Sequence, residues 1–329
     1  MRKLILRFLA WVYRLCLVFS QSWHRGMPCG IKKVPARVIS VGNITWGGTG
    51  KTPLVTKLAR DLSYYGKRVV VLVRGYGKDE VEELRKNLPH IPILVGRDRV
   101  RTARRAVKQF NAEYILLDDG FQHIRLHRDL DIVNINAAAP FGPGGLTPMG
   151  TLREPLENLA RADIFMLTKS NIGSKNLHWI RQKLLSIKPN AVIFEAVHKP
   201  LKFTDGLRNS FVPLSGVKGK RVAVLSGIGD PHSFEKTVEN LGAEILFAAR
   251  FDDHHPFTPS EIGEFIRRCG ELQLREVITT EKDFYRLEPA LKKTGASGRA
   301  PLDFYILHIE FQVGDEEDFI RRCVNSAQR

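Results

Sequence analysis

The sequence predicts an α/β protein whose mostly parallel sheet is covered by helices on both faces, followed by a smaller C-terminal α/β domain. Two observations carry this prediction. Short, almost continuously apolar segments, typical of strands buried on both faces, alternate with amphipathic segments of helical length. A second series of the same kind begins after 200–219, a stretch punctuated by Pro and Gly. We therefore expect a larger domain at 21–210 and a smaller one at 211–329.

The larger domain opens with a β-branched segment at 36–42, which predicts a strand, and 50–65 after it has the periodicity of a helix. The basic segment 98–110 predicts a second helix. Further strands are expected at 67–75, 91–96, 112–120, 130–136 and 162–170. Ligands of such sheets bind at the carboxyl ends of the strands, so functional residues are expected there.

The smaller domain shows the same alternation of apolar and amphipathic segments. Strands are expected at 220–230, 243–251, 275–283 and 303–311, and helices at 231–242 and 258–270.

The first 20 residues have a pattern of their own. Arg7 and Arg14 interrupt the apolar run, which is shorter than the ~20 apolar residues of a membrane-spanning helix. On a helix, Lys3, Arg7 and Arg14 fall along one side, and Leu4, Phe8, Trp11, Leu15 and Val18 fall along another. This pattern predicts an amphipathic, membrane-associating helix at 1–20 with its cations toward lipid headgroups. A helix packed on the protein's own core and a spanning anchor remain alternatives.

Composition narrows the class of partner. The formal net charge of +16 over 329 residues favours anionic lipid, phosphorylated substrates or nucleic acid. Because Lys and Arg are scattered and are not interleaved with aromatic residues, we expect no nucleic-acid partner. The four cysteines include no C-x-x-C pair, so we expect reduced thiols in a cytosolic chain, with no disulfide framework and no zinc site.

A glycine-rich segment, GNITWGGTGKTP at 42–53, joins the first strand to the first helix. Its glycines let backbone N–H groups turn toward phosphate oxygens, and the helix adds its positive end. Lys51 can reach the β- and γ-phosphates, and Thr52 can bind Mg²⁺. Thr45 replaces the usual first glycine, which weakens the match without removing this physics. The residues expected to bind the nucleotide are Thr45, Trp46, Gly47, Gly48, Thr49, Gly50, Lys51 and Thr52.

The identity of the nucleotide is indicated by a later strand end. Guanine-reading proteins carry N-K-x-D there, whereas this chain reads LTKSN at 167–171, without the aspartate. The sequence therefore favours ATP, bound in a fold like that of P-loop NTPases.

Acidic residues follow two further strands. Asp118 and Asp119 end an apolar strand and could supply a carboxylate to Mg²⁺, although a capped turn is the alternative. Asp98 precedes the basic helix, where it could cap the helix or act as a base near the acceptor hydroxyl; spacing alone favours the cap.

Two motifs of the smaller domain stay open. In FDDHHPFTPSE at 251–261 a metal cluster is conceivable, but adjacent side chains diverge and cannot easily share one metal ion. A histidine beside a carboxylate could instead orient or tune a base. TTEKD at 279–283 could bind a ligand or simply end a strand.

Together these segments resemble one family, the tetraacyldisaccharide 4′-kinases of lipid A biosynthesis. The resemblance covers roughly 35–285, in family order, and the variant phosphate loop is the family's own form. It is carried by VISVGNITWGGTGKTP, RGYG, GRDRV, DDGFQHIRLHRDLDIV, GPGGLTPMGTLREPL, SGIGDPHSF, FDDHHPFT and TTEKD. One departure is the brief segment GYGKDEVEELRKNLPHIP at 75–92, where family members commonly carry a longer insertion.

The resemblance implies transfer of the γ-phosphate of ATP to the 4′-hydroxyl of a tetraacylated glucosamine disaccharide 1-phosphate, yielding lipid IVA. It implies Asp98 as the base, supported by His254, while Asp118 and Asp119 would serve Mg²⁺ and the catalytic electrostatics. The catalytic set expected from it is Asp98, His254, Lys51, Asp118, Asp119 and Arg153. The metal set is Thr52, Asp118, Asp119 and Glu154.

The same resemblance implies a membrane-embedded acylated disaccharide as substrate and an anionic membrane surface as partner. We expect a monomer at the cytoplasmic face of the inner membrane, peripheral or anchored by the N-terminal helix. Two other functions remain possible on the residues alone. A P-loop ATPase with a water-soluble acceptor would act on vesicles equally well without residues 1–20. A basic nucleic-acid-binding protein would bind DNA salt-sensitively without ATP turnover.

Overall fold

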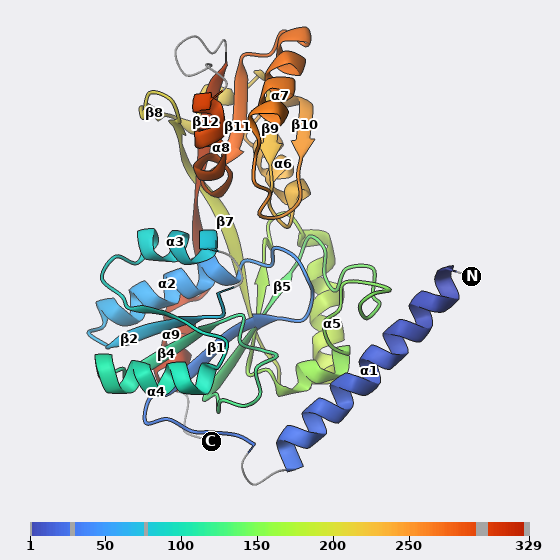
Figure 1. Ribbon diagram of the computed structural model, residues 1–329, viewed down its shortest axis with the longest axis vertical. Helices are drawn as coiled ribbons and strands as arrows, with labels where there is room; N and C mark the ends of the chain where they lie inside the picture. Colours follow the sequence, from blue (N-terminus) through green and yellow to red (C-terminus); the bar gives the residue numbers. More distant parts are fainter. Residues whose placement is uncertain (1, 27–29, 76–77, 294–301, 326–329) are drawn as a thin grey trace. The chain divides into compact units, whose positions relative to one another are not determined.

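The computed structural model describes residues 2–26, 30–75, 78–293 and 302–325. The chain folds into two compact units (Figure 1). The first unit comprises Met1–Val197 and Phe311–Arg329, and the second comprises His198–Glu310.

The first unit contains a sheet with the strand order β7-β6-β5-β1-β4-β2-β3, and each pairing along this path is parallel. Its register places Asp118 opposite Val41, and Asn134 opposite Asn43. The strands are β1 (Arg37–Asn43), β2 (Val69–Val73), β3 (Ile93–Val95), β4 (Tyr114–Asp118), β5 (Leu130–Asn136), β6 (Ile164–Thr168) and the first part of β7 (Val192–Asp205).

Helices cover both faces of this sheet because its strands alternate apolar side chains between the two faces. Ile39 and Val41 belong to a core with α2 (Lys51–Tyr64), α3 (Lys78–Asn87) and α9 (Glu316–Asn325). The opposite face packs against α4 (Arg99–Phe110) and α5 (Leu177–Ile187). Short 3₁₀ helices at Leu156–Arg161 and Ser174–Asn176 complete the unit.

The second unit has a smaller sheet in the order β10-β9-β11-β12, again parallel, and β8 pairs antiparallel with the end of β7. Helix α6 packs on one face, and α7 and α8 on the other. Its elements are β8 (Phe211–Val212), a 3₁₀ helix (Leu214–Val217), β9 (Arg221–Ser226), α6 (Pro231–Asn240), β10 (Glu244–Arg250), α7 (Pro259–Glu271), β11 (Glu276–Thr280), α8 (Glu281–Lys293) and β12 (Asp303–Val313).

The predicted fold class is confirmed, and the two compact units have other bounds than the predicted domains. The chain leaves the first unit within β7 and returns to it within β12, so the second unit ends at Glu310 and not at the C-terminus. The returning segment belongs to the first unit because its apolar side chains complete that unit's core. The ring of Phe319 on α9 lies 5.4 Å from that of Phe194, edge to face.

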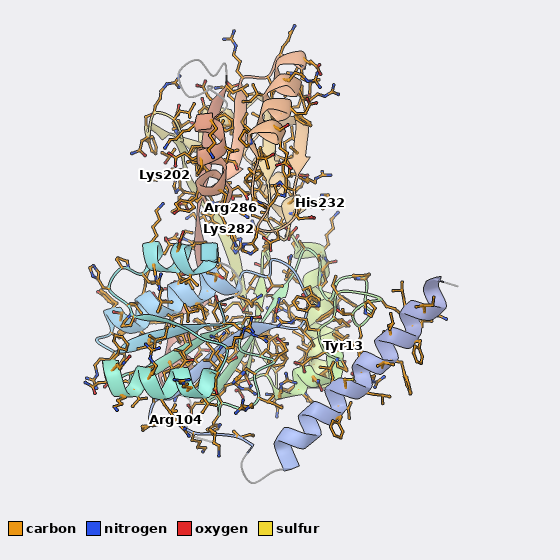
Figure 2. The ribbon with its side chains drawn as sticks, viewed as in Figure 1. Tyr13, Arg104, Lys202, His232, Lys282 and Arg286 are labelled. Atoms are coloured by element: carbon orange, nitrogen blue, oxygen red, sulfur yellow. The ribbon has the colours of Figure 1, made fainter. Side chains whose placement is uncertain are left out.

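Helix α1 (Arg2–Gly26) is grouped with the first unit, and Tyr13, labelled in Figure 2, donates a hydrogen bond from its hydroxyl to the carbonyl of Arg153 at 2.9 Å. Most of its described large apolar side chains are exposed, including Phe8 at 60% and Phe19 at 69%. Exposure on this scale is unusual for a helix packed on a core. Among the described residues, no helix is long and apolar enough to cross a membrane.

Candidate nucleotide site

The loop between β1 and α2 is shaped by two glycines with left-handed backbone angles. Gly47 has φ 108° and Gly50 has φ 76°, and residues with a Cβ rarely adopt such backbone angles. Within the loop, the carbonyl of Thr49 is bound by side chains of the sheet. It accepts hydrogen bonds from Asn134 Nδ2 at 3.3 Å and from Thr168 Oγ1 at 3.1 Å. Because the N–H of a planar trans peptide points opposite to its carbonyl, the N–H of Gly50 is directed away from the sheet, as a phosphate nest requires.

The first part of the loop pairs with residues 151–152. Thr45 forms an antiparallel bridge with Leu152, and the Trp46 N–H donates to the carbonyl of Thr151 at 2.8 Å. The backbone of Thr45 and Trp46 is therefore paired with residues 151–152. Thr45 and Trp46, which we predicted as nucleotide-binding residues, shape the loop from its edge.

Three charged residues converge at the start of α2. Lys51 Nζ lies 3.7 Å from Asp119 Oδ1, and Arg153 binds the same carboxylate with both Nη atoms, at 2.6 and 3.1 Å. Burial would raise the pKa of Asp119, but Lys51 and Arg153 outweigh it and hold that pKa below its ordinary value. Asn43 Oδ1 also accepts a hydrogen bond from Arg153 at 3.1 Å. Two fixed cations thus face the end of the loop where a terminal phosphate would lie.

Oxygen donors for a cation lie beside these charges. Thr52 Oγ1 donates to Asp118 Oδ2 at 3.2 Å, at the carboxyl end of β4. The buried Arg99 holds the backbone here, because its Nη2 donates to the carbonyl of Asp118 at 2.9 Å. Burial lowers the pKa of Arg99 to about 10, so its guanidinium stays charged at neutral pH. A hydroxyl and carboxylates beside a phosphate nest fit Mg²⁺, which takes few protein ligands and completes its shell with phosphate and water.

Glu154 is engaged elsewhere. Its two carboxylate oxygens accept hydrogen bonds from Arg161 at 2.7 and 2.8 Å, and Asn158 donates to one of them at 2.7 Å. Burial would raise the pKa of Glu154, but the hydrogen bonds from Arg161 outweigh it and keep that pKa low. These contacts anchor the turn after Arg153. They do not involve a metal ion, so the metal role of Glu154 stays a prediction.

Asp98 caps α4, as spacing predicted. Its Oδ1 accepts a hydrogen bond from the Arg101 N–H at 3.1 Å, and its carboxylate is exposed. That hydrogen bond, with Arg125 and His123 nearby, lowers the pKa of Asp98 below its ordinary value. Burial and neighbouring arginines lower the pKa of His123 to about 4, so this imidazole is neutral at neutral pH. Asp98 can act both as a helix cap and as a base, because its second carboxylate oxygen can still accept the proton of the acceptor hydroxyl.

His254 lies in the second unit, so its pairing with Asp98 stays a prediction. Its backbone has φ 65°, and its N–H donates to the carbonyl of Gly227 at 3.2 Å. The same carbonyl accepts from Arg286 Nη2 at 3.0 Å, and Arg286 also binds the fully buried Asp283 at 2.8 Å. Arg286 is labelled on α8 in Figure 2. The TTEKD segment therefore ends β11 and begins α8, and through Asp283 and Arg286 it supports the loop that carries His254.

Three supporting residues were not assigned from the sequence. Arg99 holds Asp118, Asn43 holds Arg153, and Arg161 holds Glu154. No local signal singles out Arg99, because it lies among other arginines of the basic segment 97–105.

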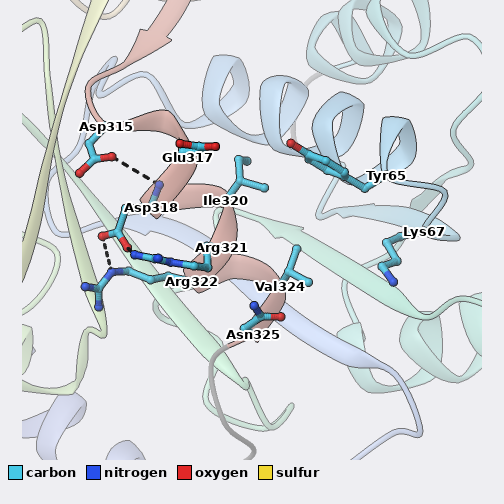
Figure 3. A pocket seen from close by; sticks show the side chains of 10 residues that line it. All are labelled: Tyr65, Lys67, Asp315, Glu317, Asp318, Ile320, Arg321, Arg322, Val324 and Asn325. Atoms are coloured by element: carbon cyan, nitrogen blue, oxygen red, sulfur yellow. Dashed lines mark hydrogen bonds and ion pairs between the residues drawn. The ribbon is translucent and has the colours of Figure 1, made fainter.

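A hollow of about 880 Å³ on the first unit lies outside this site (Figure 3). Its lining comes from α9, from Asp315 directly before it, and from Tyr65 and Lys67, which follow the carboxyl end of α2. The phosphate loop lies at the other end of that helix, whose 14 residues span roughly 21 Å. Charged residues of the hollow pair with one another, as Asp318 does with Arg322 at 2.7 Å.

Comparison with known proteins decides the family. A family model described as LpxK: Tetraacyldisaccharide-1-P 4'-kinase matches residues 2–85 and 79–328. The chain belongs to the tetraacyldisaccharide 4′-kinase family. It is therefore an ATP-using kinase of lipid A biosynthesis. The two matched ranges overlap at 79–85, within α3 (Lys78–Asn87), where the sequence has its brief segment.

Relatives in this family cover most of the chain. The tetraacyldisaccharide 4′-kinase of Halothermothrix orenii is 38% identical over 313 residues, covering 85% of this chain and 81% of the relative. That of Syntrophus aciditrophicus is 35% identical over 348 residues, covering 96% and 91%. A crystal structure of LpxK from Aquifex aeolicus in complex with ATP matches with a TM-score of 0.69 and 27% identity, covering 98% of both chains.

Proposed function

We propose that this kinase transfers the γ-phosphate of ATP to the 4′-hydroxyl of a tetraacyldisaccharide 1-phosphate and so forms lipid IVA. The observation that carries the proposal is the convergence of Lys51, Arg153 and Asp119 at the end of a glycine-shaped phosphate loop. The test is incubation of the protein with labelled ATP and the disaccharide 1-phosphate. A bisphosphorylated product is expected, and labelled inorganic phosphate without that product would contradict the acceptor.

Phosphoryl transfer depends on positioning and charge neutralisation more than on covalent help from the protein. Backbone N–H groups from Gly47 to Thr52 would hold the phosphates, while Lys51 and Arg153 would stabilise the charge that spreads over the transferred group. Thr52, Asp118 and Asp119 would hold Mg²⁺, which neutralises phosphate charge when bound.

On the acceptor side, Asp98 would accept the proton of the 4′-hydroxyl. The hydroxyl oxygen then forms its bond to the γ-phosphorus while the bond to the β–γ bridging oxygen breaks, and ADP leaves. His254 would orient or tune Asp98 from the second unit. The lowered pKa of Asp98 has two opposite effects on its role as base. The low pKa keeps the carboxylate ionised, and it also makes the carboxylate a weaker base.

We expect Thr52→Val to raise the Mg²⁺ concentration needed for half-maximal turnover by about tenfold or more, because valine keeps the shape of threonine but removes an oxygen ligand. The measurement is turnover against Mg²⁺ at saturating ATP. Thr56→Val, one turn further along α2, is the control and should leave the Mg²⁺ dependence unchanged. An unaltered curve for Thr52→Val would exclude the hydroxyl as a ligand.

Membrane association would place the site beside its lipid substrate, at the cytoplasmic face of the inner membrane, with a monomer docked peripherally. The exposed apolar side chains of α1 support this proposal. Helix α4 adds charge: it contains no acidic residue, and four exposed cations lie along it, including Arg104, labelled in Figure 2. Within the described residues, no ion pair is formed by these four cations, Arg101, Arg104, Arg105 and Lys108. Their charges are therefore available to anionic headgroups.

We expect Phe8→Ser together with Phe19→Ser to weaken binding to vesicles containing phosphatidylglycerol by at least about tenfold, since two exposed rings no longer enter the lipid. Vesicle sedimentation measures the change. Phe211→Ser removes an equally exposed phenylalanine from the second unit and serves as the control. Equal binding by all three proteins would exclude α1 as the docking surface.

A further inference from the structure

Trp46 is an exposed aromatic residue within the phosphate loop. Its side chain is 57% exposed, yet the ring is held in place from two directions. The indole Nε1 donates to Thr147 Oγ1 at 2.9 Å, and the guanidinium carbon of Arg153 lies 4.7 Å from the ring centroid. An exposed, oriented tryptophan presents a rigid apolar surface to whatever enters beside it.

The hydrogen-bond donors of Trp46 are already used. The backbone N–H binds the carbonyl of Thr151, and the indole N–H binds Thr147. Trp46 therefore has no donor to offer a phosphate, and Arg153 covers one face of its ring. The uncovered ring face is the part of Trp46 available to a ligand, and it suits a flat apolar surface.

The position of Trp46 indicates which part of the bound substrates would meet the uncovered ring face. Arg153, which stacks on the ring, also binds Asp119, and Asp119 in turn meets Lys51. These charges mark the γ-phosphate end of the nucleotide, as proposed above. The nucleotide base is separated from that end by the whole triphosphate, whereas the acceptor hydroxyl must meet it.

We propose that the free face of Trp46 is a stacking platform for the acceptor sugar that carries the 4′-hydroxyl. The ring C–H groups of a pyranose form an apolar face that packs against an indole, while its hydroxyls stay at the rim for polar partners. This subsite rests on the proposed function and adds a sugar contact to it. Together with Asp98, it would fix the angle at which the hydroxyl approaches the phosphate.

The first test is steady-state kinetics in detergent micelles of fixed composition, so that docking on membranes does not affect the result. Trp46→Leu is expected to raise the KM for the disaccharide 1-phosphate by roughly five- to tenfold and to change the KM for ATP by less than about twofold. Trp46→Phe, which restores an aromatic face, should recover part of the loss. Trp179→Leu is the matched control, because Trp179 is 50% exposed on α5 and outside the site.

The second test reads the ring itself. The chain has four tryptophans, so replacing Trp11, Trp23 and Trp179 with phenylalanine leaves Trp46 as the sole indole emitter. Its emission is expected to shift on addition of the glucosamine disaccharide 1-phosphate without acyl chains, and not on addition of ATP with Mg²⁺. A shift with ATP alone would assign the ring to the nucleotide, and a shift only with the acylated compound would assign it to an acyl chain. Either result would overturn the proposal.

Failure of the subsite can be distinguished from failure of the proposed function. Wild-type protein that forms product, with an unchanged acceptor KM in Trp46→Leu, would reject the platform and leave the reaction standing. Wild-type protein that forms no bisphosphorylated product in the same micelles would count against the reaction itself.

Discussion

Replacing Lys51 with alanine is expected to lower turnover by about 100- to 1000-fold, the effect of removing one preorganised charge from a transition state. Lys51 opens α2 directly after the left-handed Gly50, its Nζ lies 3.7 Å from Asp119 Oδ1, and in the proposed mechanism its ammonium group contacts the terminal phosphate. The protein should still fold, because Asp119 keeps its two hydrogen bonds to Arg153 when the lysine is lost. Turnover with saturating ATP and acceptor measures the effect, and thermal unfolding monitors the fold.

Lys51→Arg is the informative companion, since it keeps the charge but changes its geometry. It should retain more activity than the alanine variant and less than the wild type. Lys67→Ala, which removes a lysine beyond the carboxyl end of α2, should behave as wild type. A Lys51→Ala enzyme with wild-type turnover would show that this lysine does not contact the transferred phosphate.

The sheet could be predicted from local pattern because strands buried on both faces are apolar almost throughout. Strand β5 was placed at 130–136 and is found at Leu130–Asn136. The domain boundary could not be predicted, because local pattern does not tell which sheet a strand joins. Strand β7 runs for 14 residues and passes from one unit to the other, and the pairing that decides its place is distant in sequence.

The site was predictable in its residue types and less so in its contacts. Glycines at 47, 48 and 50 and acids at the end of β4 are the residue types that phosphate and metal chemistry favours, so their pattern is visible in the sequence. The family resemblance implied a catalytic role for Arg153 and a metal role for Glu154. The structure directs them to different partners, Arg153 to Asp119 and Glu154 to Arg161, and such contacts between residues separated in sequence cannot be read from local pattern.

Asp98 is the residue at which a structural role and a catalytic role must be separated. Asp98→Ala is expected to cut turnover by at least about 100-fold with ATP binding largely retained. It also removes the cap of α4, which costs about 1 kcal/mol of stability. Asp98→Asn resolves the ambiguity, because asparagine caps a helix as well as aspartate does but cannot accept the proton.

We therefore expect Asp98→Asn to unfold at the wild-type temperature and to be as inactive as the alanine variant. An asparagine variant with near-normal turnover would reduce Asp98 to a helix cap. The pH dependence gives an independent check: because the Arg101 N–H lowers the pKa of Asp98, the carboxylate stays ionised until the pH falls below the ordinary aspartate value. Protonation of Asp98 should consequently cause no loss of wild-type turnover between pH 5 and 7, and any loss in that range must come from another group.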